Sequence, residues 1–167
     1  PDLLNKDLIS FVNMGRLSPE KNQAALIKAF AKAYDANKNL RLYIIGDGAL
    51  MGELKGLVHS LNLDGKVILT GNLDNPFMLM KDCSCFILPS LHEGQPVSLL
   101  EARLLKLPIS SAASSLFDNG QLVIGNSVDD IYNGLIAFIN NEVPTCEFEY
   151  ADYNNITIKQ FEDIINE

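Results

Sequence analysis

Six short runs of apolar residues recur along the chain, separated for the most part by stretches with the spacing of amphipathic helices. The runs lie at residues 8–14, 40–45, 67–69, 85–88, 108–111 and 122–124. They are largely apolar throughout rather than alternating with polar residues, which is typical of parallel strands that are buried on both faces. Strands that alternate with helices form one parallel sheet covered by helices on both sides. The sequence therefore predicts a doubly wound α/β domain.

The helical patterns have recognisable ends. Ser18, Pro19 and Glu20 are a cap residue, a proline and an acid in the order typical of a helix start. We predict helices at residues 18–34, after Gly48 as far as about 62, at 75–80, 97–105 and 128–140, and a last helix at 156–166.

Composition narrows the classes of function. The chain has 167 residues, of which 47% are hydrophobic, enough for the core of one domain. Its formal net charge of −8 argues against a nucleic-acid partner, which requires a basic surface. A phosphate site remains compatible with this charge, because it requires only two or three local cations.

Localisation and cofactors are constrained less directly. No apolar run approaches the roughly 20 residues that span a bilayer, so any membrane association is expected to be peripheral. We expect a cytoplasmic protein, free or at the inner face of the membrane. Cys83, Cys85 and Cys146 have neither the number nor the spacing of a disulfide framework or zinc site.

Polar and glycine-rich turns follow the predicted strands. They lie at residues 15–16, 46–48, 70–71 and 90–95. Ligands of doubly wound sheets bind outside the carboxyl ends of the strands, and parallel strands place all these ends at one edge. We therefore expect these four turns to converge on one crevice.

The last of these turns has the most specific pattern. Glu93 and Gly94 follow a predicted strand, a proline occupies the first expected helical position, and Glu101 lies about one turn inside that helix. Free N–H groups at Gly94, Gln95 and Val97 would point out of the helix start, where the dipole favours anions. Two carboxylates beside an anion-binding amide cluster suit a ligand with both hydroxyl and phosphate groups. A nucleotide-sugar has this chemistry.

Three motifs together resemble a known family. Residues 13–22 contain Gly-Arg-Leu followed by an acid and a lysine, residues 42–48 form a second strand motif, and Glu93 and Glu101 form a glutamate pair with seven residues between them. In this order they resemble the donor-binding, carboxyl-terminal half of the GT-B glycosyltransferases, specifically the large retaining family that builds bacterial polysaccharides. The resemblance covers residues 10–108 and implies a Rossmann-like domain that is one half of a GT-B architecture.

The resemblance implies roles for individual residues. It implies that Arg16 and Lys21 hold the donor's diphosphate and stabilise charge on the departing nucleoside diphosphate, which requires no metal or other cofactor. It implies that Glu93 contacts the sugar ring, so that Arg16, Lys21 and Glu93 form the catalytic set. Glu101 is implied to accept hydrogen bonds from the ribose hydroxyls.

Further donor contacts follow from the same resemblance. Gly15 and the amides of Gly94 and Gln95 are implied to lie beside the donor, and Gly71 and Asn72 near its base. The residues alone leave simpler interpretations open. Lys21 could be a solvated residue balanced by Glu20, Glu93 an exposed loop acid, and Glu101 a partner of Lys106 or an acid on the solvent face.

The sequence departs from the family pattern after the glutamate pair. Lys106 stands where the family usually has glycine, and residues 109–117 form a shorter, serine-rich segment. These departures motivate an alternative function, that of a degenerate GT-B module that binds a partner or a glycan without catalysis. An epimerase or phosphorylase on the same scaffold ranks below it. A dehydrogenase is excluded because Gly15 stands alone after the first strand, without the dinucleotide-binding glycine pattern.

The expected function is therefore that of part of an enzyme. Residues 1–167 are predicted to form the donor domain of a hexosyltransferase that acts on a polysaccharide or cell-envelope acceptor. The resemblance implies that the acceptor site belongs to an amino-terminal domain, and we expect that domain to be absent from this chain. We expect the chain to bind donor, to have that missing domain as its partner, and to be inactive alone.

Overall fold

One parallel sheet of six strands organises the chain. The computed structural model describes residues 8–92, 97–112 and 121–143. The strands are β1 (Ile9–Met14), β2 (Leu40–Ile45), β3 (Val67–Gly71), β4 (Cys85–Leu88), β5 (Ile109–Ser111) and β6 (Leu122–Val123). They pair in the order β3-β2-β1-β4-β5-β6, with every pairing parallel. This is the Rossmann-like order, and it confirms the predicted doubly wound fold.

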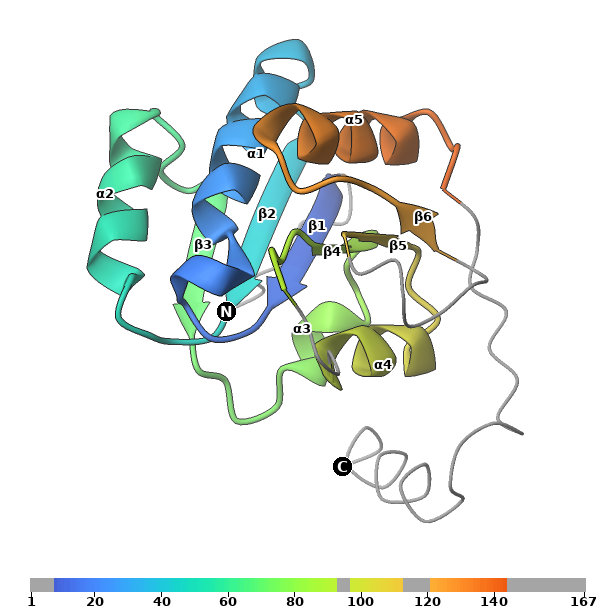
Figure 1. Ribbon diagram of the computed structural model, residues 1–167, viewed down its shortest axis with the longest axis horizontal. Coiled ribbons are helices and arrows are strands. Elements are labelled where there is room, and N and C mark those ends of the chain that lie inside the picture. The colour runs from blue at the N-terminus through green and yellow to red at the C-terminus, as the bar shows by residue number, and fades with distance from the viewer. Residues whose placement is uncertain (1–7, 93–96, 113–120, 144–167) are drawn as a thin grey trace.

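Helices cover both faces of the sheet (Figure 1). Helices α1 (Gln23–Ala36), α2 (Met51–Ser60) and α5 (Val128–Ile139) lie on one face, and α3 (Phe77–Met80) and α4 (Val97–Leu104) lie on the other. Neighbouring strand residues point to opposite faces, so Phe11 belongs to the first core and Val12 to the second, both fully buried. This two-sided burial explains why the strands are apolar throughout.

The predicted helix start at residues 18–20 is wrong in detail. Pro19–Lys21 form a short 3-10 turn, η1, and α1 begins only at Gln23. Between them Asn22 adopts the left-handed conformation, with φ of 58°. Asparagine tolerates this conformation, which interrupts the helical hydrogen-bond ladder and redirects the chain. Lys21 therefore lies on a separate turn in front of α1 rather than inside the helix.

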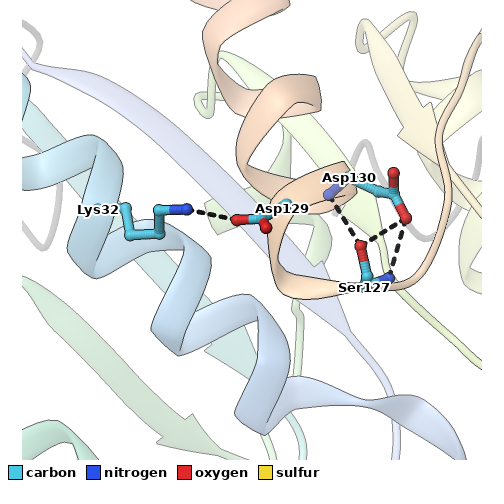
Figure 2. A network of polar contacts seen from close by, with 4 residues as sticks. All are labelled: Lys32, Ser127, Asp129 and Asp130. Carbon is cyan, nitrogen blue, oxygen red and sulfur yellow. Dashed lines mark hydrogen bonds and ion pairs between the residues drawn. The ribbon is translucent and has the colours of Figure 1, made fainter.

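The start of α5 is fixed to α1 (Figure 2). The Ser127 hydroxyl accepts a hydrogen bond from the Asp130 N–H at 3.1 Å, and the Asp130 carboxylate accepts one from the Ser127 N–H at 3.3 Å. This reciprocal capping box satisfies donors at the helix start. Lys32 of α1 forms an ion pair with Asp129 in the same turn. The loop that enters α5 is thereby held at a defined place beside α1.

The other predicted strands and helices are confirmed, with ends that differ by a few residues. The predicted helix at residues 156–166 lies outside the described residues. Within the described part of the chain, no helix combines the length and the apolar character needed to cross a membrane.

Candidate functional site

The turns after β1, β2 and β3 are joined to one another by main-chain hydrogen bonds. The Gly15 N–H donates to the Ile45 carbonyl at 3.0 Å, and the Gly46 N–H donates to the Gly71 carbonyl at 2.9 Å. The predicted convergence of these three turns at the carboxyl edge of the sheet is therefore confirmed. The turn after β4 is described only as far as residue 92.

Two glycines allow the turns after β1 and β2 to touch. Gly46 has φ of 129°, and a Cβ atom there would lie 2.2 Å from the Gly15 carbonyl oxygen. A Cβ atom on Gly48 would lie 2.4 Å from the Leu17 carbonyl oxygen. Any larger residue at either position would push the two turns apart.

A cavity of about 390 Å³ opens over these turns. Gly15 and Arg16 line it from the turn after β1, Gly46 and Asp47 from the turn after β2, and Asn72 from the turn after β3. Its volume falls in the range typical of small-molecule sites, and its position outside the carboxyl ends of the strands is where doubly wound sheets bind ligands. The structure thus brings together three of the predicted site residues, namely Gly15, Arg16 and Asn72.

Lys21 approaches the same edge from η1. A Cβ atom added to Gly15 would lie 3.8 Å from the Cδ and Cε atoms of Lys21, so the aliphatic part of this side chain passes over Gly15. Glu20 links the two cations electrostatically. A hydrogen bond from the Ser18 hydroxyl, at 2.6 Å, lowers the pKa of the Glu20 carboxyl, and Lys21 and Arg16 lower it further. Arg16 and Lys21 are therefore both within electrostatic reach of the Glu20 carboxyl.

The main chain at Arg16 is held by a residue that the sequence did not single out. Gln23, the first residue of α1, has 1% of its surface exposed. Its Nε2 atom donates a hydrogen bond to the Arg16 carbonyl at 2.9 Å. This bond fixes the peptide that carries the Arg16 side chain, which is itself exposed at the rim.

The acidic half of the predicted site is only partly described. Glu93, Gly94 and Gln95 lie outside the described residues. Glu101 is the fifth residue of α4, a helix whose chain comes from the carboxyl end of β4. It is half-buried, and it does not appear among the described residues that line the cavity beside Arg16.

Burial raises the pKa of the Glu101 carboxyl above its ordinary value of 4.5. A raised pKa in the folded state means that the fold is more stable with the Glu101 carboxyl protonated than with it ionised. The free energy of unfolding therefore falls as the pH rises through the raised pKa. We expect Glu101→Gln to be at least as stable as the unsubstituted chain at pH 7, with its advantage vanishing below a pH of about 4. Melting temperatures measured from pH 4 to pH 8 test this expectation. Lower stability of the variant at pH 7 would show that the ionised carboxylate has a stabilising partner.

A second cavity, of about 360 Å³, lies at the other end of the sheet, between β6 and α5. Asp130 and Glu142 line it, and no lysine or arginine among the described residues does. An anionic ligand would be repelled there, so the cavity beside Arg16 is the better candidate for a phosphate group. Among the described residues, no group of three or more His, Cys, Asp or Glu side chains is placed to hold a metal ion.

Comparison with known proteins supports the resemblance noted in the sequence. Residues 2–155 match the family model described as glycosyl transferases group 1. An uncharacterized glycosyltransferase of Methanocaldococcus jannaschii is 35% identical over 153 residues, an alignment that covers 89% of this chain and 37% of that protein. The N-acetylgalactosamine-N,N'-diacetylbacillosaminyl-diphospho-undecaprenol 4-alpha-N-acetylgalactosaminyltransferase of Campylobacter jejuni is 32% identical, and the match covers 84% of this chain and 40% of that enzyme.

Solved structures have the same fold. A variant of Staphylococcus aureus TarM, in complex with Fondaparinux, alpha-GlcNAc-glycerol and UDP, superposes with a TM-score of 0.76 at 20% identity. The superposition covers 100% of this chain and 37% of that structure. The chain thus spans about two fifths or less of the length of the relatives described here.

Proposed function

Since the chain belongs to the group 1 glycosyltransferases, we propose that it is the donor-binding half of a retaining hexosyltransferase that uses a nucleoside-diphosphate sugar. The observation that carries the proposal is the placement of Arg16 and Lys21 around the Gly15 turn, beside a cavity at the carboxyl edge of the sheet. Both side chains carry the positive charge that an anionic ligand requires, although the chain as a whole has a formal net charge of −8.

Diphosphate binding is the step that these residues support best. The Arg16 guanidinium can donate two parallel hydrogen bonds to phosphate oxygens, and the Lys21 ammonium adds a point charge beside it. When the bond between sugar and phosphate breaks, negative charge develops on the departing diphosphate. Fixed cations stabilise that charge most where the main chain under them is held in place, as Gln23 holds it under Arg16.

Other parts of the proposed donor site follow from the family resemblance. We assign Glu93 to the sugar, Glu101 to the ribose hydroxyls, and Gly71 and Asn72 to the base. Asn72 lines the cavity, and the Gly71 carbonyl is bonded to the turn after β2, so both lie at the same edge as Arg16. The retained configuration at the sugar is proposed from the glutamate-pair motif.

We assign acceptor binding to residues beyond this chain. The match covers 37% to 40% of the two curated relatives described above, which leaves room in those proteins for a second domain. The Campylobacter enzyme is named for a lipid-linked diphosphate acceptor, and TarM was crystallised with a glycerol-linked sugar. By analogy, we propose a cell-envelope glycan as the acceptor and a cytoplasmic location at the inner face of the membrane.

Two departures from the family pattern suggest a degenerate module, and the structure explains one of them, Lys106. Lys106 adopts the left-handed conformation, with φ of 57°, two residues after the end of α4 at Leu104. Its N–H donates to the Arg103 carbonyl and the Leu107 N–H donates to the Ala102 carbonyl, so this residue ends the helix. Glycine is the usual residue at such a position because it lacks a Cβ atom. The departure therefore concerns the end of a helix, and nothing in it removes a ligand contact.

A calorimetric titration of the chain with uridine diphosphate tests the proposed function. UDP is the probe because it is the nucleotide in the complex of TarM. We expect saturable binding, with uridine, which lacks phosphate, binding at least tenfold more weakly, roughly the loss of one charge-assisted hydrogen bond. Guanosine diphosphate in a parallel titration tests the choice of base. Equal affinity for UDP and uridine, or no binding of either diphosphate, would refute the proposal.

A further inference from the structure

Asn22 connects three segments that are distant in the sequence. Its main chain joins η1 to α1 in the left-handed conformation, with φ of 58°. Its side-chain Nδ2 atom donates one hydrogen bond to the Pro89 carbonyl at 3.0 Å and another to the Asn126 carbonyl at 2.8 Å. Pro89 follows β4 and Asn126 precedes α5, so one amide group joins the turn after β1 to two other loops.

The residue on the other side of Lys21 is held as well. The Leu91 N–H donates a hydrogen bond to the Glu20 carbonyl at 2.9 Å. Both neighbours of Lys21 are therefore bonded to the chain that leaves β4. The aliphatic part of Lys21 passes over Gly15 between these two attachments. The main chain that carries Lys21 is thus held on both sides by bonds that its neighbours make.

The loop at Asn126 offers Asn22 a fixed acceptor. The next residue, Ser127, belongs to the capping box with Asp130, and the Lys32–Asp129 ion pair holds the same turn against α1 (Figure 2). The hydrogen bond from Asn22 therefore joins η1 to a loop that has contacts of its own with α1 and α5.

We propose that Asn22 is a positioning residue for donor binding, which acts by holding Lys21 at the Gly15 turn. This inference rests on the proposed function, in which Lys21 contacts the donor's diphosphate. Asparagine meets both requirements of the position. Glycine would allow the left-handed main chain but has no amide group, and aspartate would place a carboxylate against two carbonyl oxygens.

UDP affinities of Asn22→Gly, Lys21→Ala and the double variant test the inference. Glycine keeps the left-handed turn without strain, so this substitution isolates the amide. We expect Asn22→Gly to weaken UDP binding about fivefold and to leave uridine binding unchanged, because one fixed charge is displaced while the base contacts remain. In the Lys21→Ala background, the same substitution is expected to cause little further loss, because residues that act through one contact are non-additive.

Ser84→Ala is the matched control for a general loss of stability. Ser84 precedes β4, at the amino ends of the strands and away from the cavity. Its hydroxyl accepts a hydrogen bond from the Ser10 N–H at 3.0 Å. We expect this variant to melt at a lower temperature yet to bind UDP normally below its transition.

The possible outcomes separate the two proposals. Equal losses from Asn22→Gly in both backgrounds, or equal losses for UDP and uridine, would overturn the positioning role and leave the proposed function standing. Unchanged UDP affinity in Asn22→Gly would do the same. If Lys21→Ala binds UDP like the unsubstituted chain, the diphosphate contact itself is wrong, and the role of Asn22 falls with it.

Discussion

Replacing Arg16 with alanine is expected to weaken binding of uridine diphosphate by about 10- to 100-fold. Hydrogen bonds to charged groups contribute roughly 1.5–3 kcal/mol each, which corresponds to this range of affinity. Arg16 is exposed at the rim of the cavity, so its side chain supports little of the core and the folded state should survive the substitution. Calorimetric titration of the variant measures the effect directly.

Two further variants show what kind of contact is lost. Arg16→Lys keeps the charge but loses the planar pair of donors, so we expect an intermediate affinity. Arg41→Ala removes an arginine near the amino end of β2, away from the cavity, and this variant should bind UDP normally. Equal losses in Arg16→Ala and Arg41→Ala would indicate a general effect of net charge rather than a contact with phosphate.

Replacing Gly46 with alanine is expected to damage both stability and binding. The new Cβ atom would lie 2.2 Å from the Gly15 carbonyl oxygen, on a main chain with φ of 129° that side chains rarely adopt. Backbone strain of this kind costs about 1–3 kcal/mol before the clash is added, so a chain of this size should melt at least about 2–12 °C lower. Because relief of the clash moves the Gly15 turn, UDP affinity should fall as well, even below the melting transition.

Gly56→Ala provides the matched comparison for that substitution. Gly56 lies inside α2, and nothing is within 4 Å of the place where its Cβ atom would be. Alanine is favoured over glycine in a helix by about 0.5–1 kcal/mol, so this variant should melt slightly higher and bind UDP unchanged. A Gly46→Ala variant with normal melting and affinity would show that the two turns do not need their close approach.

The apolar runs predicted the sheet well because a strand buried on both faces leaves a clear pattern. Cys85–Leu88 is such a strand, and its predicted bounds are those of the structure. The turn residues Gly15, Arg16 and Asn72 were also predictable as neighbours, because parallel strands present their carboxyl ends at one edge.

Other features were not predictable because they depend on contacts across the fold. The bond from Gln23 to the Arg16 carbonyl and the two bonds from Asn22 join side chains to main-chain carbonyls, and such bonds leave no periodic pattern in a sequence. The sequence predicts a longer helix in place of the short turn at Pro19–Lys21 because Pro19 and Glu20 suit either structure. The left-handed conformation of Asn22 decides between them.

The most direct test is to locate the residues of this chain that UDP contacts. Backbone amide signals of the chain, followed by nuclear magnetic resonance during titration with UDP, report this residue by residue. We predict the largest changes at Gly15, Arg16 and Asn72, around the cavity at the carboxyl edge of the sheet. Changes confined to Gly125 and Gly134, at the cavity between β6 and α5, with Gly15 and Arg16 unaffected, would contradict it.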